Sequence, residues 1–357
     1  MNAKKLKPND KVAIISLSSG VLGEPFASHE LELGVKRLKE FGLVPIIMPN
    51  SLKGMEYLKN HPEARADDLK TAFADSEIKA IICAIGGNDT YKTFPYLLND
   101  DVFISNVKNH PKIFIGFSDT TANHIMFHYL GLDTFYGPAL LTDFAEFEKN
   151  MLPYTKNAID YLFNPIKDYE IKSSPVWYED RKDFSVSAVG TLRVSHNESK
   201  GYEVLQGSNV VSGKLLGGCI EVLNQLLPDE NSSNEEKEIL TKFNIFPSLD
   251  DWKNKIMFIE TSEEKIKPEN YRRIIQKFKN LGIFNQINGL LVGKPIDEIY
   301  YEEYKQILKE ELAEFDFPII YNLNFGHAYP RMVLPYGAIC EINPSKKSIK
   351  LTSTTLE

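Results

Sequence analysis

The stretch IFIGFSDTTANH, residues 113–124, combines the three features that decide the fold. Its first three residues form an apolar run of the kind that a buried strand requires. A short corner, GFSD, follows at residues 116–119, and a helix is expected to begin at Thr120. A buried strand that turns directly into a helix is the building unit of a parallel α/β sheet. This stretch therefore predicts an α/β protein.

The chain on either side repeats the same alternation. Further strands are expected over residues 11–19, 43–49 and 78–87, and helices over residues 29–42 and 64–75. We predict a first domain over residues 1–165 with a parallel sheet, and a second α/β domain over residues 211–357. Residues 166–210 are polar and irregular, and we expect a connecting segment that folds over a cleft between the domains.

Composition excludes several classes of protein. A chain of 357 residues is too long for one compact core, so two domains are expected. Its contents of 43% hydrophobic and 25% charged residues are ordinary for a globular protein. The net charge of −8 argues against nucleic acid or an anionic membrane as a partner. The three cysteines form neither a disulfide framework nor a zinc motif. We therefore expect a cytoplasmic protein without a membrane span.

Ser118 lies on the corner after the strand, and two interpretations of it remain open. A serine on a sharp strand-to-helix turn is exposed as a nucleophile, and the next backbone N–H can face an oxyanion. The turn is G-F-S-D-T, so Thr120 replaces the second glycine of the G-x-S-x-G hydrolase turn. Alternatively, Ser118 or Asp119 only caps the helix that follows.

A serine nucleophile needs a base and an acid that orients the base. His327 lies between an apolar run and a proline-rich loop, so it can project into a cleft, although it can also be an ordinary loop histidine. Glu260 directly follows the apolar run IMFI and should lie at the carboxyl end of a strand. Glu263 and Glu264 precede a helix and are better explained as solvated first-turn acids.

Other chemical groups give weaker signals. His124 and His128 are spaced like metal ligands, but Ile125 stands where a zincin carries glutamate, so we expect no metal site. The glycines of AIGGND, residues 84–89, lack dinucleotide spacing, so we expect no organic cofactor, yet they let a backbone N–H approach a ligand. Cys219 could be a nucleophile at a helix start, although a small buried residue explains it better.

Several blocks together resemble the LD-carboxypeptidase family of serine peptidases, and in particular its branch of microcin C immunity proteins. The resemblance implies a flavodoxin-like N-terminal domain and a smaller C-terminal α/β domain of the swivelling β/β/α type. It also implies a cytoplasmic homodimer. The blocks, which follow the family's order, are RADDL (65–69), AIGGNDTYK (84–92), PKIFIGFSDTTANH (111–124), FYGPALLTDFAE (135–146), GKLLGGC (213–219), IMFIETSEE (256–264), GLLVGK (289–294) and FGHAYPRMVLPYG (325–337).

The resemblance implies a role for each matching residue. Ser118 would be the nucleophile, His327 the base and Glu260 the acid of a Ser-Glu-His triad. The backbone N–H groups of Gly87 and Asp119 would form the oxyanion hole. The implied reaction is amide hydrolysis through an acyl-enzyme, without a metal or organic cofactor.

The substrate remains open between two classes. The immunity branch cleaves the amide between an aminoacyl group and a modified nucleotide, which would confer self-immunity, whereas the murein enzymes remove D-alanine from an LD-tetrapeptide. Gly86 and Asn88 in the GGND loop resemble the immunity branch, which we therefore favour. Trp177 could stack on a nucleobase or only fasten its own loop. A non-catalytic small-molecule-binding protein is the remote alternative.

Overall fold

A parallel sheet of six strands organises the first half of the chain, and the computed structural model describes all residues, 1–357. The strand order is β14-β5-β4-β3-β1-β2, and every pair is parallel except β14 with β5. The predicted α/β class with parallel sheets is therefore confirmed. The strands are β1 (Lys11–Ile15), β2 (Val44–Ile47), β3 (Ile78–Cys83), β4 (Ile113–Gly116), β5 (Phe135–Tyr136) and β14 (Leu334–Pro335).

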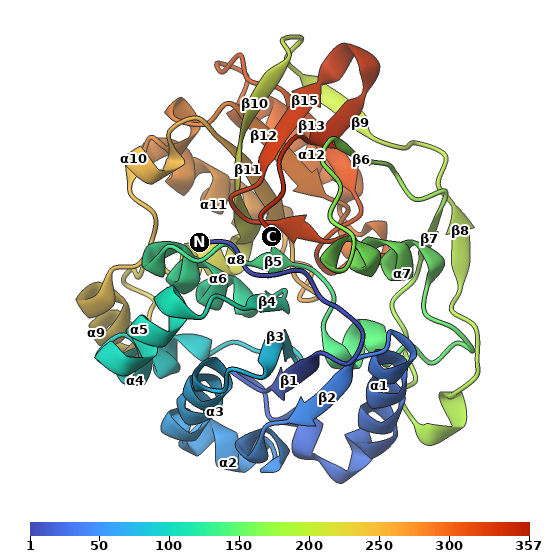
Figure 1. Ribbon diagram of the computed structural model, residues 1–357. Helices are drawn as coiled ribbons and strands as arrows, with labels where there is room; N and C mark the ends of the chain where they lie inside the picture. Colours follow the sequence, from blue (N-terminus) through green and yellow to red (C-terminus); the bar gives the residue numbers. More distant parts are fainter.

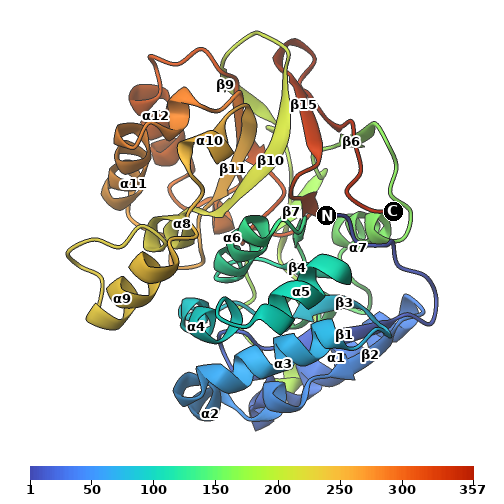
Figure 2. The same ribbon diagram turned by 60° about the vertical axis from the view of Figure 1, so that its left-hand side comes forward.

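Helices connect these strands and cover the sheet, as Figures 1 and 2 show. The expected helices over 29–42 and 64–75 are present as α1 and α3. Parallel strands need such crossovers, because a tight turn joins only antiparallel neighbours. The helices of this half are α1 (Ser28–Glu40), α2 (Met55–Asn60), α3 (Pro62–Ala74), α4 (Phe94–Leu97), α5 (Asp101–Asn109), α6 (Thr120–Leu130) and α7 (Pro153–Ile159).

A second, mixed sheet of eight strands lies above the first in Figure 1. Its order is β6-β16-β15-β10-β11-β12-β13-β9, and the four central strands β10 to β13 are parallel. The strands are β6 (Tyr169–Ile171), β9 (Glu203–Gln206), β10 (Val211–Cys219), β11 (Lys255–Glu260), β12 (Gly289–Gly293), β13 (Ile319–Leu323), β15 (Ile339–Asn343) and β16 (Ser348–Leu351). The helices are α8 (Ile220–Gln225), α9 (Asn234–Phe243), α10 (Leu249–Trp252), α11 (Pro268–Asn280) and α12 (Tyr301–Glu311).

The segment between the two halves is more regular than its sequence indicates. Strands β6 and β9 form the two edges of the second sheet, and β7 (Val176–Tyr178) pairs with β8 (Ser195–Asn197) in a separate ribbon. The predicted limits of this segment, residues 166 and 210, stay a prediction. No helix combines the length and the apolar character that crossing a bilayer requires.

Two features join the halves. Strand β14 belongs to the second half of the sequence but pairs antiparallel with β5 at the edge of the first sheet. One hydrophobic cluster of 94 buried residues includes side chains from both sheets. The carboxyl ends of β3, β4 and β11 consequently lie near one another, which is where functional groups collect in such sheets.

Candidate active site

Ser118 occupies a strained corner between β4 and α6. Its φ angle is +64°, in the left-handed region that a side chain with a Cβ rarely adopts. The neighbouring loop accommodates the corner because residue 86 is glycine: a Cβ there would lie 2.7 Å from the Ser118 Cβ. Neither predicted cap is made, since α6 has Asp119 at its N-cap without a capping hydrogen bond. The capping interpretation is therefore wrong, and the strained corner holds the Ser118 hydroxyl at the strand end.

Glu260 and His327 form a buried hydrogen-bonded pair. Glu260 ends β11, and its Oε2 accepts a hydrogen bond from His327 Nδ1 at 2.8 Å and from the His327 backbone N–H at 3.2 Å. The Tyr136 hydroxyl donates to the other oxygen, Oε1, at 2.5 Å. The same hydroxyl accepts the backbone N–H of Ser118 at 3.2 Å, so one phenol links the serine corner to the buried acid.

The loop before His327 is shaped around this carboxylate. Gly326 has a φ of +83°, and a Cβ at this position would lie 2.3 Å from the carboxyl carbon of Glu260. Only glycine fits both the backbone conformation and the space. The close approach of Gly326 thus fixes the distance between Glu260 and the imidazole.

Glu263 contacts the opposite side of the imidazole. Its Oε2 lies 2.9 Å from His327 Nε2, although 59% of the Glu263 side chain is exposed. Glu263 is therefore exposed to solvent as expected, but it lies before the first turn of α11 and also contacts the imidazole, which the sequence did not predict. Burial favours the neutral imidazole, but Glu260 and then Glu263 outweigh it and raise the pKa of His327 to about 10. In this arrangement His327 is protonated at neutral pH, and Ser118 is not its hydrogen-bond partner.

Two backbone N–H groups beside Ser118 have no hydrogen-bond partner, those of Gly87 and Asp119. The next two N–H groups of the loop, from Asn88 and Asp89, both donate to the Ser18 hydroxyl at 3.0 and 3.2 Å. Gly87 has a φ of +150°, and a Cβ would lie 2.2 Å from that hydroxyl oxygen. The loop is thus held with two donors free at the serine, as an oxyanion hole requires.

Two cavities of different character meet at Ser118, and Ser19, Gly87 and Glu263 line both of them. The first, of about 620 Å³, we call the acidic cavity. Its acidic lining residues are Asp89, Asp119, Glu221, Glu263 and Glu264, and Lys59 is its single basic residue.

The second cavity, of about 480 Å³, we call the apolar cavity. His327 lines only this cavity. Its aromatic walls include two largely exposed rings, Phe26 at 58% and Phe184 at 48% exposure, and the buried ring of Tyr329. Flat exposed rings of this kind suit a planar ligand.

Comparison with known proteins identifies the family. Residues 12–137 match the LD-carboxypeptidase N-terminal domain, and residues 212–342 match the LD-carboxypeptidase C-terminal domain. The chain belongs to the LD-carboxypeptidase family. It is therefore a hydrolase of the serine peptidase and carboxypeptidase class.

Several known proteins match most of the chain. A MccF-like protein from Streptococcus pneumoniae, solved in complex with AMP, is 46% identical with a TM-score of 0.90 and 98% coverage of both chains. A probable murein peptide carboxypeptidase from Bacillus subtilis is 27% identical over 97% of this chain and 92% of its own length. The microcin C7 self-immunity protein MccF of Escherichia coli is 25% identical over 82% and 79%.

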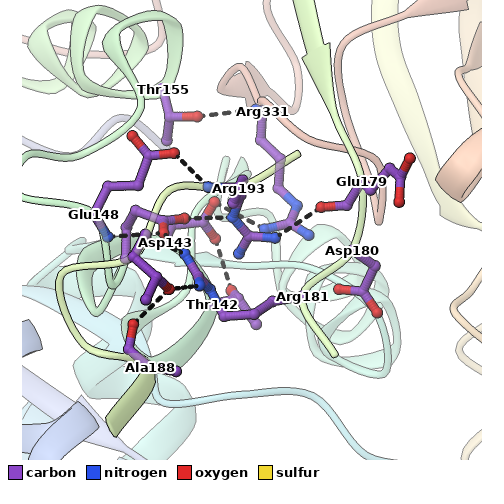
Figure 3. Close-up of polar contacts among 12 residues, drawn as sticks. Thr142, Asp143, Glu148, Thr155, Glu179, Asp180, Arg181, Ala188, Arg193 and Arg331 are labelled. Carbon is purple, nitrogen blue, oxygen red and sulfur yellow. Dashed lines mark hydrogen bonds and ion pairs between the residues drawn. The ribbon is translucent and has the colours of Figure 1, made fainter. Parts of the chain in front are cut away.

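Figure 3 shows three arginines, Arg181, Arg193 and Arg331, that lie close together in this family member. Arg331 holds the loop that carries His327. Arg331 donates to the carbonyl oxygens of Gly326 and His327 and to Asp143 Oδ1, the last two at 2.9 and 2.8 Å. Its guanidinium also lies 4.3 Å from the centre of the Phe117 ring, next to Ser118. Arg331 therefore fixes the backbone of His327 relative to the serine corner.

The same cluster fastens the segment between the two halves. Glu146 is buried and accepts from Arg181 at 2.9 Å and from Arg193 at 2.6 Å, two arginines of that segment. The guanidinium of Arg193 stacks on Tyr329 at 3.7 Å, and that of Arg331 lies 3.9 Å from the same ring. No sequence pattern predicts a role for these residues, although Glu146 and Arg331 lie inside blocks that carry the resemblance.

The other residues singled out in the sequence differ in which of the two cavities they line. Gly86 lines the apolar cavity and Asn88 the acidic cavity. Trp177 lines neither cavity, and its ring stacks on His196 with 4.2 Å between centroids. Its role in substrate binding stays a prediction. Cys219 is buried, and burial and then Glu221 raise the pKa of its thiol well above the usual range, which favours a packing role.

Proposed function

We propose that the protein hydrolyses an amide bond through a Ser118–His327–Glu260 triad. The observation that carries the proposal is the junction of three groups: a serine in a strained corner, two unpaired N–H groups beside it, and a histidine held by a buried carboxylate. These are the nucleophile, oxyanion donors and oriented base of acyl transfer.

The first step requires His327 Nε2 to be free of Glu263. A substrate that displaces Glu263 lowers the proton affinity of the imidazole, and the Nε2 proton leaves to the departing Glu263 carboxylate or to water. The neutral imidazole then accepts the Ser118 proton. The Ser118 oxygen attacks the amide carbonyl, and the oxyanion that forms is bound by the N–H groups of Gly87 and Asp119. Glu260 holds the Nδ1–H and stabilises the imidazolium.

The second half of the reaction returns the enzyme to its starting state. His327 Nε2 donates its proton to the leaving nitrogen as the C–N bond breaks, which leaves an acyl ester on Ser118. A water molecule then gives a proton to His327 and attacks the ester. The acid is released, and the proton returns to the Ser118 oxygen. No step in this sequence requires a group from outside the chain other than water.

The apolar cavity favours an aminoacyl nucleotide as substrate. The leaving group must lie beside the histidine that protonates it, and His327 lines only the apolar cavity. A nucleobase can stack on Phe26 or Phe184 there, whereas D-alanine has no surface that would use these rings. The AMP complex of the 46%-identical relative supports this choice. Such a hydrolase would inactivate microcin C-like compounds and confer resistance.

A parallel assay tests the proposal. The protein is offered an aminoacyl sulfamoyl adenosine and an LD-tetrapeptide, and we expect hydrolysis of the nucleoside compound. Ser118→Ala should lower kcat by about 10⁴-fold or more, whereas Ser19→Ala, a serine of the same two cavities, should retain activity. Preferential cleavage of the tetrapeptide would assign the protein to the murein enzymes, and an active Ser118→Ala variant would remove the serine mechanism.

A further inference from the structure

The position of His327 decides which part of the substrate enters the acidic cavity. The leaving group occupies the apolar cavity, because His327 protonates it there. The carbonyl oxygen faces Gly87 and Asp119. The acyl part must therefore extend past Ser118 in the other direction, into the acidic cavity, which adjoins the same serine.

The acidic cavity keeps three carboxylates that no basic side chain of the protein neutralises. Asp89 pairs with Arg65 at 2.6 Å, and Glu263 faces His327. The others, Asp119, Glu221 and Glu264, form no ion pair with any basic residue. Lys59, the one cation of the lining, is exposed and free of ion pairs. The cavity thus has a negative potential that its own residues do not balance.

Asp119 gives an independent indication of a missing partner. Its side chain is 1% exposed, and while Oδ2 accepts the Thr90 N–H at 2.9 Å, Oδ1 forms no ion pair and no well-formed hydrogen bond. Only the nearby Ser18 hydroxyl acts on the Asp119 carboxylate as a further donor. Burial raises the pKa of Asp119 to about 6, so the group is still mostly ionised at neutral pH. A buried carboxylate oxygen without a well-formed hydrogen bond is costly, and a cationic group nearby would offset that cost.

Glu221 lines the same cavity as Asp119, and hydrogen bonds fix its orientation. Its Oε1 accepts from the backbone N–H and the hydroxyl of Ser262, at 2.9 and 2.7 Å, which fixes the carboxylate at the start of α8. Glu264 follows two residues after Ser262, is exposed and lines the same cavity. A cation that enters the cavity therefore meets the carboxyl groups of Glu221, Glu264 and Asp119 in the lining that also contains Ser118.

We propose that the acidic cavity binds a cationic side chain on the acyl side of the scissile amide, so that the enzyme prefers lysine-like acyl residues to neutral or acidic ones. This inference rests on the proposed function, because it uses the direction of the substrate that His327 sets.

The test compares three sulfamoyl adenosines whose acyl residues are lysyl, norleucyl and glutamyl. Norleucine retains the lysine chain but lacks the ammonium. We expect kcat/KM to fall in the order lysyl, norleucyl, glutamyl. Glu264→Gln should lower the lysyl-to-norleucyl ratio by about 2- to 5-fold, mainly through KM, since one exposed charge pair has about this strength. Glu221→Gln should act in the same direction, and Glu238→Gln, an exposed acid of α9 outside the cavity, should leave the ratio unchanged.

The outcomes separate this inference from the proposed function. Hydrolysis of all three compounds with the glutamyl compound equal to or better than the norleucyl one would overturn the inference and leave the triad intact. If no nucleoside compound is cleaved, the nucleotide assignment fails, and LD-tetrapeptides with lysine or norleucine before the D-alanine replace the series. Equal rates for those two peptides would again overturn the inference, and so would a lack of hydrolysis in both series.

Discussion

The two ring nitrogens of His327 contact two different glutamates, and this decides how the residue should titrate. Glu263 contributes to the raised pKa of His327, and the base must be neutral to accept a proton. A raised pKa therefore moves the rise of kcat/KM towards alkaline pH. Glu263→Gln removes one of the two carboxylates, so the rise should shift to lower pH and the activity near neutral pH should increase. The pH profile of kcat/KM measures this shift. An unchanged profile would show that Glu263 does not face the base in solution.

Gly326 allows a second test at the scale of one residue. Gly326→Ala should lower kcat/KM by about 10²-fold, because its Cβ would displace the Glu260 carboxylate and misplace the base. Gly190→Ala is the matched control: its φ is also positive, +93°, but a Cβ there meets nothing within 4 Å. Backbone strain should cost both variants about 1–2 kcal/mol, measured by thermal unfolding, and the clash with Glu260 should add to the loss of Gly326→Ala. Only the Gly326 variant should lose activity. Equal activities would contradict the proposed importance of this close approach.

At the scale of the elements, the buried Glu146 holds the segment between the two halves through ion pairs with Arg181 and Arg193. Glu146→Gln leaves these arginines without their counter-charge, and breaking a buried pair costs about 3–5 kcal/mol. Glu302→Gln is the control, because its pair with Lys305 is 69% exposed on the Glu302 side and such pairs contribute at most about 1 kcal/mol. Thermal unfolding at pH 7 should separate the two variants clearly.

The effect of Glu146→Gln should depend on pH. Burial raises the pKa of Glu146, but Arg193, then the backbone N–H of Glu148 and then Arg181 outweigh it, so the pKa is lower in the folded protein than in the unfolded chain. A depressed pKa stabilises the fold above the unfolded value of about 4.3, and that stabilisation is lost as the pH falls through the folded pKa. The difference in melting temperature between wild type and Glu146→Gln should therefore shrink below about pH 4. A difference that stays constant down to acid pH would contradict the ionic role.

The elements also show which parts of the structure the sequence can predict. Strands β1 to β4 and helices α1, α3 and α6 follow from local patterns, because a buried run or a helical face is visible within one segment. Strands β6, β9 and β14 have two to four residues each and exist through pairing with distant strands, so no local pattern marks them. The contact between Glu263 and His327 was missed for the same reason: it joins loops that only the assembled fold brings together.

At the scale of the molecule, the site exists only where the two halves meet. Ser118 comes from the first half and Glu260 and His327 from the second, and the Tyr136 hydroxyl joins them. Because one hydrophobic cluster also spans both halves, we expect unfolding in denaturant to be a single transition. Far-ultraviolet circular dichroism and hydrolytic activity should be lost at the same concentration. Two separated transitions would show that each half folds independently.

The contact between Glu263 and His327 has a consequence for fidelity. Under the proposed mechanism, an enzyme whose base is already protonated does not attack an amide that merely collides with the serine. Turnover begins only for a ligand that gains enough from the cavities to displace Glu263, so binding energy from parts of the substrate far from the carbonyl activates the base. Ser118 would not attack ordinary peptides that fill neither cavity, because His327 would stay protonated. Unwanted hydrolysis of the cell's own proteins would then be limited by the contact between Glu263 and His327, and no lid or partner protein would be needed.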